Sequence, residues 1–162
     1  MRNLGAYYPH RPQRLNGPLL TMLLNGLHDR HAGRVFVIEV GAGDGHGTPG
    51  LLERFRNDGW SGLLIEPHPA LFSALETLHA QSDRVAVLNL GVSDVAGSYP
   101  LYSLSSAARE RHPAAALNRA SLIRDRILGP GIAESDLRID EIPVLRLDAV
   151  LGELGIVSVQ LV

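Results

Sequence analysis

Three glycines alternate with other residues directly after an apolar run. Residues 35–40 are Val-Phe-Val-Ile-Glu-Val, and residues 41–45 are Gly-Ala-Gly-Asp-Gly. Glycine allows the backbone to turn tightly and to lie against a ligand without a Cβ in the way. The run before it is rich in β-favouring apolar residues, which predicts a strand buried on both faces of a parallel sheet. We therefore expect a ligand-binding loop at the carboxyl end of this strand.

A second apolar run ends in an acid. Residues 62–65 are Gly-Leu-Leu-Ile, and Glu66 follows them. A carboxylate at the end of the second strand of a nucleotide-binding unit can accept both hydroxyl groups of a ribose. The loop and the acid together predict an adenosine-containing cofactor, bound at the C-terminal edge of an α/β, doubly wound, mostly parallel sheet.

The spacing of the glycines disfavours a dinucleotide. The pattern Gly-x-Gly-x-x-Gly starting at Gly41 needs a third glycine at position 46, which is His46. A formal match occupies residues 45–50, but it begins five residues after Val40. Its Pro49 has the character of a first helical residue after a Thr48 cap, so the match is in the wrong register for a pyrophosphate turn.

Charge favours S-adenosylmethionine over NAD. Glu39 lies inside the end of the first strand and Asp44 lies within the loop. At about 5 Å and an effective dielectric constant near 20, each would repel a pyrophosphate charge by roughly 3 kcal/mol. S-adenosylmethionine has no phosphate, and its ammonium and sulfonium groups would be attracted. Two alternatives stay open: a nicotinamide-dependent oxidoreductase, and a glycine turn that binds no ligand.

Composition excludes several other classes. The chain has 162 residues, a formal net charge of −2 and no cysteine. Disulfides, thiolate metal sites and cysteine nucleophiles are therefore excluded, and non-specific nucleic-acid binding is not indicated. No apolar run is long enough to span a membrane, and residues 19–24 are too short for a signal peptide. We expect a cytoplasmic protein with no nucleic-acid or membrane partner.

The alternation of elements predicts one α/β domain over residues 34–162, preceded by an arm and a helix over residues 1–33. A first helix is expected from an Asn16 cap to Gly33. The other expected elements are strands over 35–40, 62–66, 84–91 and 157–162, extended pieces over 98–102 and 142–147, and helices over 49–57, from 69, over 113–128 and over 148–154, the last capped by Asp148.

Two further sets of residues have weaker chemical interpretations. The arginines at and near the helix expected over 113–128 could face an acidic substrate, but a solvated helix face explains them better; they are Arg109, Arg111, Arg119, Arg124 and Arg126. His46 is the best-placed base for a hydroxyl acceptor, although a loop histidine in solvent is the simpler interpretation. No histidines and carboxylates have convincing metal-ligand spacing, so no metal is expected and the catalytic base is not identified.

Four segments, in order, resemble the FkbM family of S-adenosylmethionine-dependent methyltransferases. They are residues 36–45, 59–69, 89–94 and 142–148. The resemblance implies a class I methyltransferase fold, and O-methylation of a hydroxyl group on a small molecule, natural product or sugar. It also implies that Glu39, Gly41 and Gly43 hold the methionine part and Glu66 the ribose, with Pro67, His68 and residues 91–93 near the adenine. The full set of expected cofactor-binding residues is Glu39, Gly41, Ala42, Gly43, Asp44, Glu66, Pro67, His68, Gly91, Val92 and Ser93.

The chain departs from the family in two places. Family members commonly have Asn where Gly43 stands. The family's Asp-x-Glu-Gly motif should follow the strand over 157–162, where this sequence ends. Residues 157–162 would then form an uncovered edge, and such an edge aggregates or finds a partner. The sequence predicts self-association through this edge and no turnover of the chain as given, which leaves a truncated, non-catalytic binding module as a further alternative.

Overall fold

The computed structural model describes residues 17–112 and 120–162. Its first sheet is parallel and has the order β1-β2-β3, with β1 at Phe36–Val40, β2 at Ser61–Ile65 and β3 at Val85–Leu88. β1 pairs with β2 from Phe36 opposite Ser61 to Val40 opposite Ile65. These three strands fall within the ranges expected from the sequence or one residue outside them, which confirms a mixed α/β fold with a parallel sheet.

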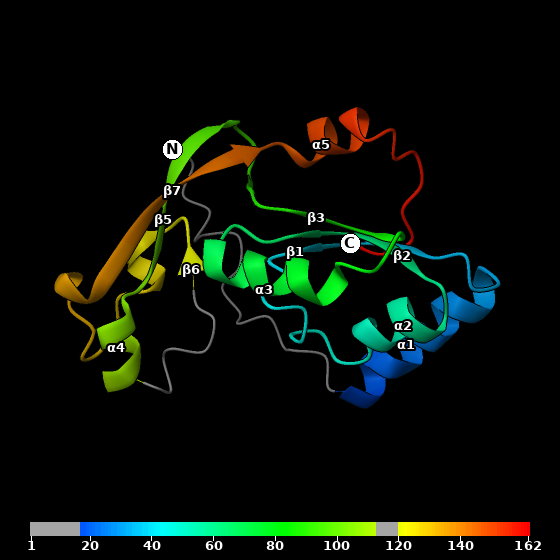
Figure 1. Cartoon of the computed structure of the whole chain (residues 1–162), viewed down its shortest axis with the longest axis horizontal. Helices are drawn as coiled ribbons and strands as arrows, with labels where there is room; N and C mark the ends of the chain where they lie inside the picture. The colour runs from blue at the N-terminus through cyan, green and yellow to red at the C-terminus, as the bar shows by residue number, and fades with distance from the viewer. Residues whose placement is uncertain (1–16, 113–119) are drawn as a thin grey trace.

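Helices cover both faces of this sheet (Figure 1). On one face lie α1 (Gly17–Arg30), α2 (Leu51–Asn57) and α3 (Pro69–His79), and their buried side chains pack on alternate residues of the strands. On the other face α5 (Leu147–Glu153) packs Val150 against Ile38 and Leu63. The arrangement follows from strands that are apolar on both sides.

The last residues lie beside β1, on the side away from β2. The Ile38 N–H donates to the Leu161 carbonyl at 2.8 Å, and the Gln160 N–H donates to the Phe36 carbonyl at 3.0 Å. The expected strand over 157–162 is nevertheless wrong in extent, because only a single parallel bridge, Val37 with Leu161, forms. The Gln160 side chain accepts from the Phe36 N–H at 2.7 Å and so takes a donor that a longer ladder would use. Val157 is 98% exposed.

A second sheet has the order β4-β7-β5-β6. It contains β4 (Gly91–Val92), β5 (Gly97–Leu104), β6 (Ala120–Ser121) and β7 (Leu137–Leu145). β5 and β7 form an antiparallel ribbon of eight paired positions, from Gly97 opposite Val144 to Leu104 opposite Leu137. The extended piece expected over 98–102 lies within this longer ribbon, and so do residues 142–145 of the piece expected over 142–147, whereas Leu147 begins α5.

The helix expected over 113–128 is wrong where the structure describes it. Residues 120–128 contain β6 and a short 3-10 helix at Arg124–Arg126, and residues 113–119 lie outside the described part. A helix instead precedes this segment, α4 at Ser106–Arg111, with the Ser105 hydroxyl accepting from the Ala108 N–H. The expected arm over 1–15 and the Asn16 cap also lie outside the described residues.

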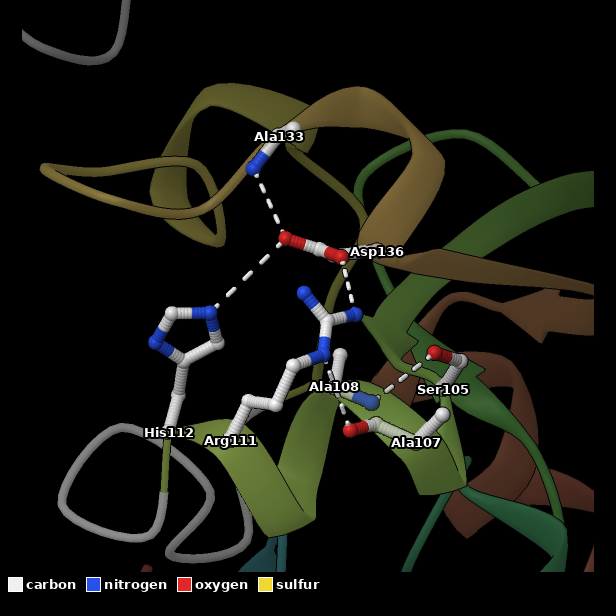
Figure 2. Close-up of polar contacts among 7 residues, drawn as sticks. All are labelled: Ser105, Ala107, Ala108, Arg111, His112, Ala133 and Asp136. Atoms are coloured by element: carbon white, nitrogen blue, oxygen red, sulfur yellow. Dashed lines mark hydrogen bonds and ion pairs between the residues drawn. The ribbon is translucent and has the colours of Figure 1, made fainter.

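Asp136 connects α4 to the turn before β7 through hydrogen bonds (Figure 2). Its carboxylate accepts hydrogen bonds from the Ala133 N–H at 2.9 Å and the Arg111 guanidinium at 2.6 Å. His112 Nε2 lies 3.8 Å from Asp136 Oδ2. These donors, the Ala133 N–H first, lower the pKa of Asp136. Because the group is buried and fully paired, we assign it a structural role.

Two expected helix caps are also wrong. Gly50, in a left-handed conformation with φ +81°, precedes α2, and the Thr48 hydroxyl donates to Glu39 rather than to the helix. Residue 146 occupies the cap position of α5, where Asp148 was expected. No helix among residues 17–112 and 120–162 is long and apolar enough to cross a membrane.

Candidate functional site

The glycine loop folds over the carboxyl end of β2. The N–H groups of Gly41 and Ala42 both donate to the Ile65 carbonyl, at 2.8 and 3.1 Å. Gly41 and Gly43 have φ values of +78° and +63°, and a Cβ added at either would have nothing within 4 Å. Gly45 differs, because its Cβ would lie 2.6 Å from Leu78 Cδ2. The first two glycines therefore border open space, whereas the third is required by packing against α3.

Glu66 accepts hydrogen bonds that hold this loop against the end of β2. Its Oε2 accepts from the Gly43 N–H at 2.7 Å, and its Oε1 accepts from the His68 N–H at 2.8 Å. The side chain is 4% exposed, and burial raises its pKa against the opposing effect of these two hydrogen bonds. Each carboxylate oxygen can accept more than one hydrogen bond, so capacity for a ribose hydroxyl remains on both oxygens.

Glu39 and Asp44 contribute the other carboxylates at the loop. The Thr48 hydroxyl donates to Glu39, whose pKa is raised by burial and lowered in smaller measure by that hydrogen bond. Asp44 Oδ1 accepts from the His46 N–H at 3.1 Å, which holds the loop in an Asx-type turn. Thus all three carboxylates, those of Glu39, Asp44 and Glu66, stabilise the conformation of residues 39–48.

Asn89 begins the segment over residues 89–94, and its side chain holds the backbone at the end of β2. Its Nδ2 donates to the carbonyl oxygens of Glu66 at 2.8 Å and Pro67 at 3.2 Å. Asn89 thus fixes the turn that follows β2 from the end of the neighbouring strand β3. An amide directly after a buried strand is the signal that indicates such a role, because it can satisfy backbone carbonyls at the sheet edge.

Ala42 and residues 91–93, which were also expected to bind the cofactor, take part in core packing or strand pairing. The Ala42 side chain is buried in the core between the sheet and α1–α3. Residues 91–93 form strand and strand end rather than a turn: Gly91–Val92 is β4, and the Ser93 N–H donates to the Leu145 carbonyl at 3.1 Å. A Cβ on Gly91 would lie 3.0 Å from Val144 Cγ2, so this glycine is packed against β7.

His68 links the end of β2 to the second sheet. Arg109 Nη2 on α4 lies 3.1 Å from His68 Nε2, and Arg109 Nε donates to the Leu104 carbonyl at 3.0 Å. Burial, followed by the nearby Arg109 charge, lowers the pKa of His68, which therefore favours the neutral imidazole. The His68 backbone N–H donates to Glu66 and its ring contacts Arg109, so this one residue joins the acid after β2 to α4.

The other polar residues singled out from the sequence have ordinary surroundings. Arg111 pairs with Asp136 and Arg124 pairs with Glu134, while Arg119 lies outside the described residues. The His46 side chain is exposed in the loop. In the described part of the chain, no group of three or more histidine, aspartate or glutamate side chains is arranged to hold a metal ion.

A pocket of about 290 Å³ lies elsewhere, between the ends of α2 and α3 and the turn before β3. Its lining includes Arg56, His79 and Arg84, and none of the residues expected to bind the cofactor. The loop site is thus supported by its backbone geometry and its carboxylates rather than by a preformed cavity.

Comparison with known proteins adds little. No protein-family model and no curated protein matches this chain. Among solved structures, it is similar to that of a glycopeptide N-methyltransferase, MtfA, complexed with sinefungin, at 16% sequence identity and a TM-score of 0.32. The alignment covers 92% of this chain and 78% of that one. A similarity of this size supports no argument about this chain.

Proposed function

We propose that this chain binds S-adenosylmethionine at the carboxyl ends of β1 and β2, in a class I methyltransferase fold, and that the function of the site is methyl transfer to a hydroxyl group of a small molecule. The observation that supports this most is the pairing of Gly43 with Glu66. It places an open, Cβ-free loop directly beside a buried carboxylate at the ends of neighbouring parallel strands.

In this proposal the cofactor lies across the strand ends. The methionine part lies against Gly41 and Gly43, where a Cβ would meet nothing and the backbone can approach a ligand closely. The ribose lies over Glu66, at the end of β2. Because β1 and β2 are adjacent and in parallel register, two ligand parts bound at their ends would be neighbours.

The charges of the site favour this cofactor over NAD. Glu39, Asp44 and Glu66 surround the loop, and the pKa of Glu66 is raised by burial first and, in smaller measure, by the charge of Asp44. A pyrophosphate would add further negative charge to this group. The positive ammonium and sulfonium groups of S-adenosylmethionine would offset it, so the same three side chains attract one cofactor and repel the other.

Methyl transfer from a sulfonium is an in-line displacement that depends mainly on alignment of the acceptor, methyl carbon and sulfur. The choice of a hydroxyl acceptor rests on the resemblance of residues 36–45, 59–69, 89–94 and 142–148 to the FkbM family. His46 is exposed, and no hydrogen bond from another residue of 17–112 or 120–162 orients its side chain as a base. We therefore assign the chain cofactor binding and methyl transfer without naming a catalytic base.

Isothermal titration calorimetry of the full chain tests the cofactor assignment. We expect saturable binding of S-adenosylhomocysteine, and binding of NAD that is weaker by about 2 kcal/mol or more, given the repulsion at close carboxylates. NAD binding that equals or exceeds that of S-adenosylhomocysteine would favour an oxidoreductase. Failure of both ligands to bind would mean that the glycines form only a turn.

A further inference from the structure

The pocket at the ends of α2 and α3 contains charged and polar groups that the proposed cofactor site does not use. Its volume of about 290 Å³ is near the lower end of the range for small-molecule sites, roughly 300–1,000 Å³. The lining combines two apolar side chains, Phe55 and Leu78, with polar and charged ones from α2, α3 and the turn before β3. The pocket therefore has room for a small organic ion.

Two arginines of the lining form no ion pair within residues 17–112 and 120–162. Arg56 on α2 and Arg84 before β3 are both exposed, and neither belongs to any of the ion pairs of this part of the chain. Arg54, also on α2, differs because it lies 2.5 Å from Asp58. Asp83 lines the pocket as well, yet it pairs with neither arginine. Both lining guanidinium groups thus keep their charge and their donors available for an anion.

His79 and Ser82 add further donors to the pocket. His79 is 7% exposed, and its ring lies edge-on to that of Phe55 with the centroids 5.8 Å apart. Burial, followed by the charge of Arg56, lowers the pKa of His79, so the imidazole is neutral at about pH 7 and has one N–H to donate. The Ser82 hydroxyl accepts from the Arg84 N–H at 3.3 Å, which leaves its own proton available for a ligand.

We propose that this pocket binds a small phosphomonoester, a ligand distinct from the cofactor. Arg56 and Arg84 bind the phosphate oxygens, because the planar fork of a guanidinium group matches the geometry of phosphate. His79 and Ser82 donate to the remaining oxygens. The organic part of the ligand packs on the two apolar side chains of the lining.

A phosphomonoester fits these groups better than a carboxylate does. Two arginines and one acid give the lining a net positive charge, and a dianion gains more from that charge than a monoanion. A phosphate group also presents three strong acceptor oxygens, whereas a carboxylate presents two. The additional oxygen uses the donors of His79 and Ser82, which a carboxylate held by both arginines would leave unpaired.

The pocket contacts the glycine loop on a side that the cofactor does not use. A Cβ added at Gly45 would lie 2.6 Å from Leu78 Cδ2 and 3.8 Å from His79 Nε2, both of which belong to residues of the lining. Gly41 and Gly43, against which the cofactor is proposed to lie, border open space instead. The two ligands therefore occupy separate places, and the phosphate site does not depend on the cofactor assignment.

Amide chemical-shift titration of the uniformly ¹⁵N-labelled full chain with phenyl phosphate tests the site. At constant ionic strength and about pH 7.5, where a phosphomonoester is a dianion, we expect saturable changes at Arg56, His79, Ser82 and Arg84. Arg56→Gln and Arg84→Gln should each raise the dissociation constant by about fivefold or more, through loss of a charge-assisted contact at an exposed position. Because both side chains are exposed, the variants should keep the fold, which their spectra report directly.

Arg30→Gln is the matched control, since Arg30 is an exposed arginine at the end of α1 and does not line the pocket. It should leave the dissociation constant within about twofold, because charges beyond the Debye length are screened. Benzoate, a monoanion with the same ring, should bind about fivefold more weakly than phenyl phosphate or worse. The inference is overturned if phenyl phosphate gives no saturable change at the lining, if Arg30→Gln weakens binding as much as Arg56→Gln, or if benzoate binds equally well.

Discussion

The Glu66 carboxylate accepts a hydrogen bond from the backbone N–H of Gly43 at 2.7 Å, across 23 residues of sequence. This contact joins the glycine loop after β1 to the acid after β2. It means that the loop conformation and the charge of the site depend on one another. A ligand that hydrogen-bonds Glu66 would also contact the glycine-loop backbone that Glu66 holds in place.

Replacement of Glu66 tests this dependence. Glu66→Ala should weaken binding of S-adenosylhomocysteine by about 1–3 kcal/mol, through loss of charge-assisted hydrogen bonds to the ribose. The substitution should also leave the Gly43 and His68 N–H groups without the acceptor that Glu66 provides. Calorimetry gives the affinity, and circular dichroism during heating reports whether the variant is folded. Unchanged affinity in a folded variant would remove Glu66 from the binding site.

Substitutions of Gly41 and Gly45 should differ in how strongly they affect cofactor binding and the stability of the fold. Gly41→Val places a β-branched residue at φ +78° beside open space, so we expect loss of cofactor binding and a loss of stability of about 1–3 kcal/mol from backbone strain. In Gly45→Ala the new Cβ would lie 2.6 Å from Leu78 Cδ2, so stability should fall more than affinity does.

Thermal unfolding and calorimetry on the two glycine variants distinguish these outcomes. Gly43→Asn serves as a comparison for backbone strain, since asparagine tolerates the left-handed conformation at φ +63° better than most residues and should cost less stability than Gly41→Val. Tight cofactor binding by a folded Gly41→Val protein would show that the loop is only a turn.

The parallel sheet and its loop were predictable because they depend on local patterns. Apolar runs at 35–40 and 62–65 with glycines after the first are enough to fix β1, β2 and the position of Glu66. The ribbon was only partly predictable, since Arg138 and Asp140 alternate with apolar residues and resemble a solvent-exposed segment. Helix α4 has no apolar periodicity and depends on Ser105 and Asp136. The link from His68 to Arg109 joins two sheets through side chains distant in sequence, which no local pattern reveals.

Asp136 should make the stability of the chain sensitive to acid. Its pKa in the folded protein is lowered from 3.8 by the Ala133 N–H and Arg111. The stability that it contributes is therefore present above its unfolded pKa, and is lost as the pH falls through the lower, folded value. Melting temperatures of the wild type and Asp136→Asn should converge over the acid range below the unfolded carboxyl pKa of about 3.9. A difference that stays constant over this range would contradict the assignment.

The edge at residues 157–162 should promote self-association. Val157 is 98% exposed and Val162 is 75% exposed, and the pairing with β1 is limited to one bridge and its neighbouring hydrogen bonds. Exposed apolar residues on an unpaired edge favour association between chains. We expect sedimentation velocity to show species larger than the monomer, and Val157→Lys combined with Val162→Lys to shift the protein toward the monomer. A wild-type protein that stays monomeric at all concentrations would refute this.

The location of the cofactor is tested most directly by amide chemical-shift perturbation. Uniformly ¹⁵N-labelled protein is titrated with S-adenosylhomocysteine, and the shifts are mapped on the backbone. We predict saturable changes concentrated at Gly41 in the glycine loop and at Gly43, Glu66 and His68, which the two Glu66 hydrogen bonds join. Changes confined to the pocket lined by Arg56, His79 and Arg84, or no saturable change anywhere, would contradict cofactor binding at the ends of β1 and β2.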